Sequence, residues 1–157
     1  MYESRIAIRK PVESDIRSLA QLILRFYMFN EEFDPSMEVA GDANSAALKL
    51  SESRVRGEGL TLVADINGRV VGYIYGTITE NLMLARRRIG LLKELYVVPE
   101  ERGRGVASML IEYAMRELSK QGIKYVAVEF PTLNIIAEKF YEKLGFRKFT
   151  SIYLKEV

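Results

Sequence analysis

The stretch from Leu95 to Leu110 constrains the fold more than any other part of this 157-residue sequence. It reads LYVVPEERGRGVASML, an apolar run followed by a turn with two glycines and a segment with helical spacing. The apolar run predicts a buried strand, and the apolar residues after the turn predict a helix over 106–118. An extended segment follows at 125–130. We therefore expect two parallel strands joined by a helix, in a sheet that is mixed.

The first half of the chain predicts an antiparallel arrangement. A short alternating strand, Arg5 to Arg9, ends before Pro11, and the strands 60–66 and 69–79 flank Asn67-Gly68, a strong hairpin signal. Apolar spacing predicts the other helices: one with its N-cap at Ser14 or Asp15, running to about Asn30, and others at 44–53 and 134–144. Further extended segments are expected at 90–98 and 146–154. No repeat or linker divides the chain, so we expect one domain over residues 1–157.

Three absent residue types exclude whole classes of chemistry. The sequence has no cysteine, no histidine and no tryptophan. Ser-His-Asp and Cys-His nucleophilic sites, disulfides and zinc fingers are therefore excluded. The formal net charge of +2 implies neither nucleic acid nor an anionic membrane as a partner. Without a membrane-spanning apolar stretch or the apolar core of a secretory signal, we expect a cytoplasmic protein.

The glycine turn before the helix predicts an anion-binding site. Gly103 and Gly105 allow the backbone to approach a ligand closely, and the first N–H groups of the helix point outward without partners. Arg102 and Arg104 add positive charge at the rim. A dinucleotide-binding Gly-x-Gly-x-x-Gly would need glycine at position 108, which is Ser108, and the sequence has no Gly-Lys-Ser/Thr of a P-loop. A solvated basic turn is the alternative.

The turn and a second block downstream resemble the GNAT superfamily of acyl-CoA-dependent N-acyltransferases. Arg102, Gly105 and Ala107 match that family's Arg/Gln-x-x-Gly-x-Gly/Ala loop. The second block, in the expected order, is Asn134-x-x-Ala137-x-x-Phe140-Tyr141-x-x-Leu144-Gly145-Phe146. The resemblance covers roughly residues 90 to 148 and is only consistent with the earlier part. Without it, Asn134 would be read as a helix cap and Tyr141 as a core aromatic residue.

The resemblance implies a fold and a set of contacts to acetyl-CoA. The fold would be a mixed, mostly antiparallel α/β (α+β) sheet of six to seven strands flanked by four helices, with a parallel pair of strands that splay apart. Acetyl-CoA would lie between these strands as a co-substrate, with no metal. Its pantetheine arm would bind Tyr96, Val97 and Val98. The remaining cofactor contacts would come from Arg102, Gly103, Arg104, Gly105, Val106, Ala107, Asn134 and Tyr141.

The resemblance also implies the chemistry. An amine would attack the thioester directly, a backbone N–H would stabilise the oxyanion, and Tyr141 would protonate the departing thiolate. Our first candidate for the general base is Glu94, because a buried strand would otherwise prefer apolar residues there. Its alternative role is a carboxylate paired with an arginine. Glu129, on the neighbouring strand, is the other candidate, and a water chain is a third.

The acceptor is indicated only by charge. Five acids and no lysine or arginine lie between Phe26 and Leu48, which favours a cationic amine or a protein or peptide amine: Glu31, Glu32, Asp34, Glu38 and Asp42. A solvated loop is the alternative, as it is for the run Arg86-Arg87-Arg88, a weak nucleic-acid signal. Tyr73 or Tyr75 would reach the acceptor or pack across strands. A non-catalytic acyl-CoA-binding module and a basic interaction protein stay as rival functions, and a homodimer stays open.

Overall fold

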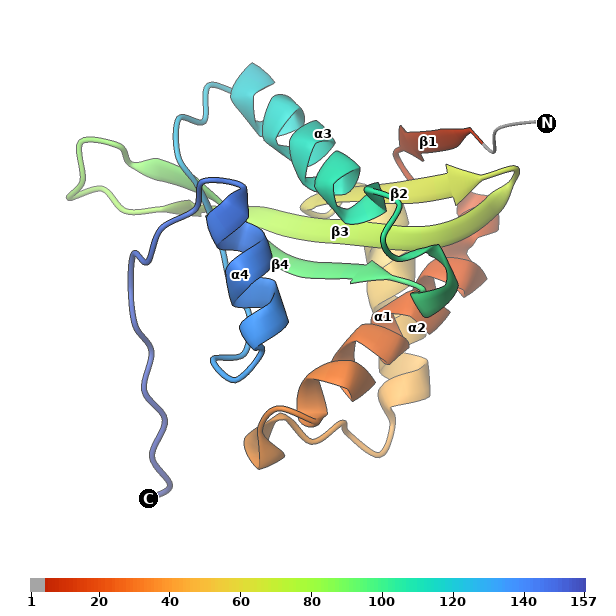
Figure 1. The fold of residues 1–157 in the computed structure, drawn as a ribbon, viewed down its shortest axis with the longest axis horizontal. Helices are drawn as coiled ribbons and strands as arrows, with labels where there is room; N and C mark the ends of the chain where they lie inside the picture. The colour runs from red at the N-terminus through yellow and green to blue at the C-terminus, as the bar shows by residue number, and fades with distance from the viewer. Residues whose placement is uncertain (1–4) are drawn as a thin grey trace.

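The computed structural model of the chain describes residues 5–157 and contains one five-stranded sheet (Figure 1). The strands, side by side in chain order, are β1 (Ile6–Arg9), β2 (Leu60–Ile66), β3 (Arg69–Glu80), β4 (Arg88–Val97) and β5 (Val126–Val128). The helices are α1 (Ile16–Glu31), α2 (Ala43–Val55), α3 (Val106–Lys120) and α4 (Ile135–Lys143). Short 3-10 turns stand at Glu13–Asp15, Pro35–Met37 and Pro99–Glu101.

The sheet is mixed, as the sequence predicts. Neighbouring strands from β1 to β4 are antiparallel, and β5 runs parallel to β4. The β2–β3 hairpin turns at Asn67 and Gly68, whose φ angles of 53° and 83° both lie in the left-handed region. This is the conformation that a two-residue hairpin turn matching the strand twist requires, which is why Asn-Gly predicts it.

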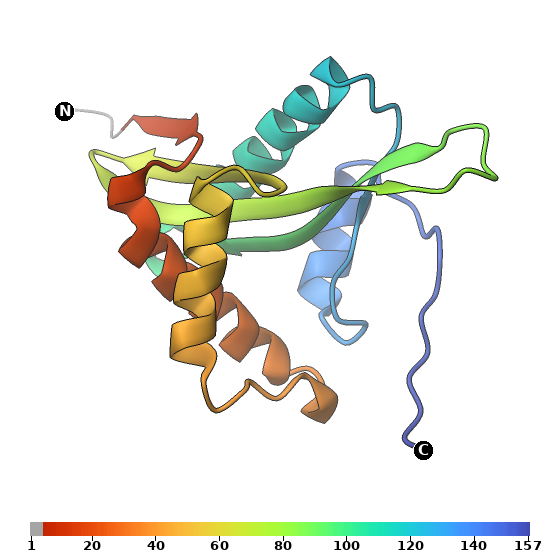
Figure 2. The same cartoon turned by 180° about the vertical axis from the view of Figure 1, so that it is seen from behind.

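Helices cover both faces of the sheet. Figures 1 and 2 show α1 and α2 on one face, and α3 and α4 on the other. Each large helix buries one stripe against the strands, including Leu19 and Ile23 of α1 and Leu110 and Leu118 of α3. In residues 5–157, no helix combines the length and apolar character needed to cross a membrane.

The C-terminal part departs from the prediction. Strand β5 spans three residues instead of 125–130, and 146–154 forms no strand, so the expected six to seven strands are five. After Gly145 the chain runs away from the sheet alongside α4 (Figures 1 and 2). Its apolar side chains are largely exposed: Phe149 (63%), Ile152 (89%), Tyr153 (92%) and Leu154 (78%). The sequence pattern is that of a strand, but no neighbouring strand pairs with it.

Candidate active site

The parallel strands β4 and β5 pair over a short length and then separate. Their ladder covers residues 90–92 of β4, and one further bond joins the Glu129 N–H to the Leu92 carbonyl (3.2 Å). Strand β4 continues to Val97, so its last residues have no strand neighbour on the β5 side. The predicted splayed pair is therefore present.

A bulge in β4 lies where this pairing ends. Tyr75 of β3 is opposite Glu94 and the next residue, Gly76, is opposite Leu92, which leaves Lys93 as an extra residue. A β-bulge bends its strand and increases the local twist. The bulge therefore accounts for the divergence of β4 from β5 immediately after Leu92.

Alternation along β4 fixes which backbone groups face the open side. The Val98 N–H donates to the Val71 carbonyl of β3 (2.9 Å), and Val97 is opposite Gly72. Since successive residues direct their polar groups to opposite sides, Tyr96 faces β3 like Val98, whereas Leu95 and Val97 face away. Of the three predicted pantetheine contacts, only Val97 directs its backbone polar groups to the open side. Leu95 joins it and was not predicted.

The turn between β4 and α3 exposes backbone N–H groups at the N-terminus of a helix. Gly103 and Gly105 both have φ of 79°, a left-handed conformation that disfavours residues with a Cβ. Gly105 is the N-cap of α3 and offers no side chain to the first N–H groups of the helix. The first N–H groups of α3 therefore point out of the helix at the positive end of its dipole; they belong to Val106, Ala107 and Ser108.

Two arginines border this turn in different ways. Arg102 folds back along β4: its Nε donates to the Val97 carbonyl (2.9 Å), and its guanidinium lies 5.5 Å from the ring centroid of Tyr96. The same guanidinium lies 5.8 Å from the Phe29 ring of α1. Arg104 forms an ion pair with Glu101. Arg102 thus already holds one carbonyl of the open edge of β4.

Helix α4 carries Tyr141 in an aromatic cluster. The ring stacks on Phe130 (centroids 5.3 Å apart) and meets Phe140 and Phe146 edge-on. Tyr141 is 7% exposed, and burial raises the pKa of its phenol above the usual value. Within residues 5–157, the hydroxyl has no hydrogen-bond partner, although its ring is fixed. Asn134 caps α4 by accepting the Ala137 N–H at 3.0 Å, the role that the residue type alone suggests.

Glu94 of β4 lies in a buried network that joins this strand to three other elements. Its two carboxylate oxygens accept one hydrogen bond each from the two Nη atoms of Arg54 on α2, both at 2.7 Å. Tyr73 of β3 donates to Oε1 (2.8 Å), and Tyr27 of α1 donates to Oε2 (3.2 Å). A carboxylate has about four acceptor positions, and these four donors occupy them. The arginine-paired role is thus present in the structure.

Burial of this network raises the pKa values of its phenols. Burial and the Glu94 charge raise the pKa of Tyr27 to about 12 and that of Tyr73 well above its usual value. Arg54 also lies over the Tyr75 ring, 3.7 Å from its centroid. Sequence reasoning missed Arg54 and Tyr27. The sequence does carry a signal for Arg54, because its spacing places it on the same stripe of α2 as the small residues Ala47 and Ser51. All three are buried in the structure.

Glu129 contrasts with Glu94. It follows β5 directly, its side chain is exposed, and among residues 5–157 no side-chain hydrogen bond or ion pair involves its carboxylate. Its backbone N–H is held by Leu92 at the point where the strands separate. The next residue, Phe130, stacks on Tyr141. Glu129 is therefore the residue before the ring that packs on Tyr141, the candidate general acid, and its carboxylate oxygens are available.

The acidic segment runs from the last residue of α1 through the α1–α2 connection, and the three arginines lie where the β3–β4 connection enters β4. Two of the five acids serve local structure: Glu31 accepts the Val39 N–H and Asp34 caps the turn at Ser36. The three arginines at 86–88 are exposed, and no ion pair joins them to those acids within the described part of the chain. No group of three Asp or Glu side chains there is arranged to hold a metal ion.

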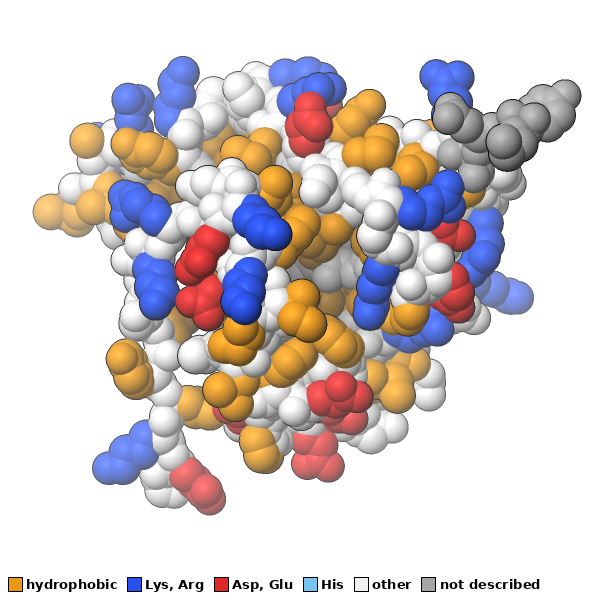
Figure 3. Space-filling model, in the orientation of Figure 1, with side chains coloured by type: hydrophobic (Ala, Val, Ile, Leu, Met, Phe, Trp, Pro, Cys, Tyr) orange, Lys and Arg blue, Asp and Glu red, His pale blue; other side chains and the backbone are white. Residues whose placement is uncertain are grey.

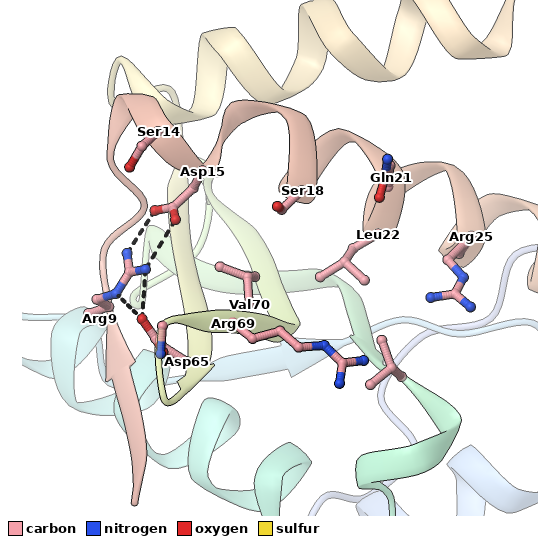
Figure 4. A pocket seen from close by; sticks show the side chains of 12 residues that line it. Arg9, Ser14, Asp15, Ser18, Gln21, Leu22, Arg25, Asp65, Arg69 and Val70 are labelled. Atoms are coloured by element: carbon pink, nitrogen blue, oxygen red, sulfur yellow. Dashed lines mark hydrogen bonds and ion pairs between the residues drawn. The ribbon is translucent and has the colours of Figure 1, made fainter.

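A polar pocket of about 670 Å³ lies beside this site, on the α1 side (Figure 4). Arg9 forms one wall, bonded to Asp15 (2.7 Å) and to Asp65 (3.0 Å). This pairing lowers the pKa of Asp15. The Asp15 carboxylate ties the start of α1 to Arg9 of β1 instead of capping the helix, and Asp65 holds the same arginine from β2. Of the predicted site residues, Val98 alone lines the pocket.

A sequence model of the acetyltransferase (GNAT) family matches residues 19–146 of this chain. An N-acetyltransferase of Bacillus subtilis is 26% identical over 145 residues, which are 91% of both chains. An N-acetyltransferase of Methanocaldococcus jannaschii is 30% identical over 86 residues, 55% of this chain, and the match spans only 38% of that protein.

Among solved structures, the aminoglycoside N-acetyltransferase AAC(6')-Iy in complex with CoA superposes with a TM-score of 0.77. The match covers 99% of this chain and 97% of that one at 21% identity. The fold is therefore shared over the whole described chain, including the helices that the motifs do not reach.

Proposed function

Since the chain belongs to the GNAT family of acetyltransferases, we propose that residues 1–157 form one N-acetyltransferase domain that moves an acetyl group from acetyl-CoA to a primary amine. The observation that carries this proposal is the open edge of β4 leading directly to the uncapped N-terminus of α3. A backbone edge suits an amide-bearing arm, and a helix N-terminus suits a pyrophosphate. A cytoplasmic location is part of the same proposal.

The donor set fits acetyl-CoA. In this proposal the N–H groups of Gly103, Arg104, Gly105, Val106 and Ala107 bind the pyrophosphate, and Leu95 and Val97 bind the pantetheine amides. The Arg102 N–H donates to the Pro99 carbonyl (3.3 Å), so Arg102 acts through its side chain. Tyr96 and Val98 shape the strand through their bonds to β3. Asn134 acts by fixing the start of α4, which keeps Tyr141 at the open edge. Arg102 would exchange its bond to Val97 for a phosphate oxygen.

The transfer needs one bond made and one broken. The acceptor nitrogen attacks the thioester carbon, and a backbone N–H facing the open edge of β4, from Leu95 or Val97, stabilises the oxyanion. The C–S bond then breaks, and Tyr141 donates its proton to the thiolate. The Tyr141 hydroxyl has no hydrogen-bond partner among residues 5–157, so it can reach the thiolate without first breaking a bond. No covalent enzyme intermediate is required, which suits a chain without cysteine or histidine.

For the general base, the geometry favours Glu129. Glu94 accepts four hydrogen bonds, so it could take up a proton only after losing a donor. Glu129 has free oxygens and acts on the ammonium directly or through water. Glu94 is the alternative, with the exposed Tyr27 as the donor that would leave. Glu129→Gln should lower kcat/KM by roughly 100-fold or more at neutral pH and less at higher pH, where more acceptor is already neutral. If Glu94→Gln alone has this pH-dependent effect, the assignment is reversed.

The acceptor we propose is a cationic amine. The acids at 31–42 that are not used in local hydrogen bonds, Glu32, Glu38 and Asp42, give the α1–α2 connection a negative charge. The aminoglycoside N-acetyltransferase with the same fold acts on an amine-bearing cation, which supports this class. Peptide and lysine amines belong to the same test panel.

Thiol release tests the whole proposal. The protein is incubated with acetyl-CoA and a panel of polyamines, aminoglycosides and peptides, and free CoA is followed over time. We expect at least one amine to raise release well above hydrolysis. If acetyl-CoA binds but no amine raises thiol release above hydrolysis, the protein is an acyl-CoA-binding module and not an enzyme. If CoA gives no thermal shift at all, the interaction-protein reading replaces both, because a bound ligand at 100 times its Kd stabilises by roughly 2.7 kcal/mol.

A further inference from the structure

The loop between β3 and β4 carries a run of exposed apolar residues that the proposed function does not use. Leu82 is 68% exposed, Met83 90% and Leu84 45%, and Ala85 after them is exposed as well. Consecutive apolar residues on a surface that faces water are unfavourable unless they bind something. The loop is therefore a candidate interaction surface.

This loop stands clear of the rest of the molecule and has a defined shape. Figures 1 and 2 show the β3–β4 hairpin extending beyond the helices. The Asn81 N–H closes the loop by donating to the Arg87 carbonyl (2.7 Å). Inside it, the Asn81 carbonyl accepts the Leu84 N–H (3.2 Å), and the Asn81 side-chain oxygen accepts the Met83 N–H (3.1 Å). The apolar side chains are thus presented at a convex, ordered tip.

Positive charge lies directly behind the apolar tip. The arginines at 86–88 are exposed, and within residues 5–157 their side chains form no hydrogen bond or ion pair. The Gly90 N–H donates to the Tyr125 carbonyl (3.0 Å), which brings the exposed Lys124 beside the start of β4. From residue 81 to residue 93 the sequence has no Asp or Glu. The net charge of +2 for the whole chain conceals this local excess of cations.

The order of these groups matches the layers of a lipid surface. Figure 3 shows apolar side chains at the end of the protruding hairpin, with cations beside them. Lipid phosphates lie above the hydrocarbon, so a docked hairpin places its apolar tip among the acyl chains and its arginines at the phosphates. Tyr125, 59% exposed beside these cations, is of a residue type enriched at that boundary.

Other macromolecules fit the hairpin less well. A convex tip enters a soft lipid surface without a preformed cavity, whereas a protein partner would have to provide a pocket for it. Nucleic acid phosphates would pair with the arginines but leave the apolar tip in water. A lipid surface with negative charge is the partner that uses both parts of the hairpin.

We propose that the β3–β4 hairpin docks this protein reversibly on an anionic lipid surface, with residues 82–84 inserted and the arginines at 86–88 on the lipid phosphates. So few apolar and basic residues give a weak attachment that needs both parts. Docking therefore requires negatively charged lipid and weakens with salt, because salt screens the arginines. It is independent of acetyl transfer and is tested without acetyl-CoA.

Flotation with lipid vesicles measures the docking. The full chain should float with vesicles of phosphatidylcholine and phosphatidylglycerol, and much less with phosphatidylcholine alone. Met83→Asp should lower the partition coefficient by roughly tenfold or more, because it replaces an inserted side chain by a charge that anionic lipid repels. The double variant Arg86→Gln, Arg87→Gln should show a similar loss on the anionic vesicles. Met28→Asp, at a 49% exposed position on α1, is the matched control and should bind like the unchanged protein.

A fluorescent label tests insertion of the tip. The chain has no cysteine, so Met83→Cys and, on α2, Lys49→Cys each carry one environment-sensitive label. On anionic vesicles the emission of the label at 83 should shift to the blue, and that of the label at 49 should stay unchanged. Circular dichroism should show the fold kept in every variant, because the substituted side chains are exposed.

Three results would contradict docking directly: no flotation of the full chain, equal losses in Met83→Asp and Met28→Asp, or a label at 83 that stays in water. Two others would assign the hairpin to a different partner. Binding to duplex DNA without binding to vesicles would assign the arginines to nucleic acid. A lower mass of Met83→Asp in light scattering would assign the tip to a contact between copies. Either of these also overturns the proposal.

Discussion

Two polar regions meet at β4, and they differ in how completely they are partnered. On the face covered by α1 and α2, the Arg54–Glu94 pair with Tyr27 and Tyr73 fills every acceptor position of the carboxylate. At the β5 side of the same strand, Leu95, Val97 and the first N–H groups of α3 have no donor or acceptor among residues 5–157, apart from the bond that Arg102 makes. A filled network holds elements together, whereas an unfilled one is available to a ligand. The predictions below separate these two roles.

The largest effect is expected from opening the filled network. Glu94→Ala leaves the guanidinium of Arg54 buried without its partner, which should cost about 3–5 kcal/mol of the free energy of unfolding. Urea denaturation measures it. Glu112→Ala, which removes an exposed pair with Arg116, is the control and should change stability by less than about 1 kcal/mol. Equal losses in the two variants would mean that the buried network does not stabilise the fold.

The converse is expected at the open site. Tyr141→Phe should lower kcat by roughly 100-fold or more, since it removes the proton donor while keeping the ring that stacks on Phe130. The thermal midpoint and the Kd for acetyl-CoA should change little. Steady-state kinetics with calorimetry measures both. An unchanged kcat would remove Tyr141 from the mechanism. A much lower thermal midpoint of unfolding would place Tyr141 with the structural residues.

Alkaline pH should weaken the filled network. Phenols ionise near pH 10 in an unfolded chain, whereas burial raises the pKa of Tyr73 well above that value and that of Tyr27 to about 12. The folded state then holds more protons, so stability that is complete below pH 10 declines as the pH rises toward 12. One buried tyrosine contributes a slope of about 1.4 kcal/mol per pH unit.

Urea titrations at several alkaline pH values give this slope. The Tyr73→Phe variant should be less stable at neutral pH, through its lost hydrogen bond, but should show a shallower decline above pH 10. Parallel declines in the two proteins would show that Tyr73 ionises as easily in the folded chain as in the unfolded one.

The smallest effect concerns the turn. Gly105→Ala forces a Cβ into a left-handed conformation, which costs about 1–2 kcal/mol if the turn is kept. We expect the Kd for CoA to rise about fivefold, which corresponds to about 1 kcal/mol. Gly57→Ala, at φ 103° in the α2–β2 connection, carries similar strain far from the turn and should leave the Kd unchanged. A similar rise in both variants would mean that lost stability, and not the turn, weakens binding.

The sequence predicts local features of this molecule better than contacts between distant residues. Asn67-Gly68 predicts its hairpin and the spacing in 106–118 predicts α3, because the signals lie within each element. The sequence predicts the turn at 102–107 for the same reason. The Arg54–Glu94 pair joins residues 40 positions apart, and no local pattern encodes it. The 146–154 segment fails for a related reason: its alternation predicts an extended chain but not what pairs with it.

The bulge at Lys93 has a consequence for hydrogen exchange. Before the bulge, the alternate amides of β4 that face outward are protected by the ladder with β5; beyond it, those of Leu95 and Val97 face no strand. One continuous strand should therefore show two exchange regimes, slow for the amides around residue 90 and fast for Leu95 and Val97. In the proposed complex acetyl-CoA lies along that edge and should slow the exchange of Leu95 and Val97 selectively. The bulge would then divide a single strand into a permanently paired part and a part that ligand binding completes.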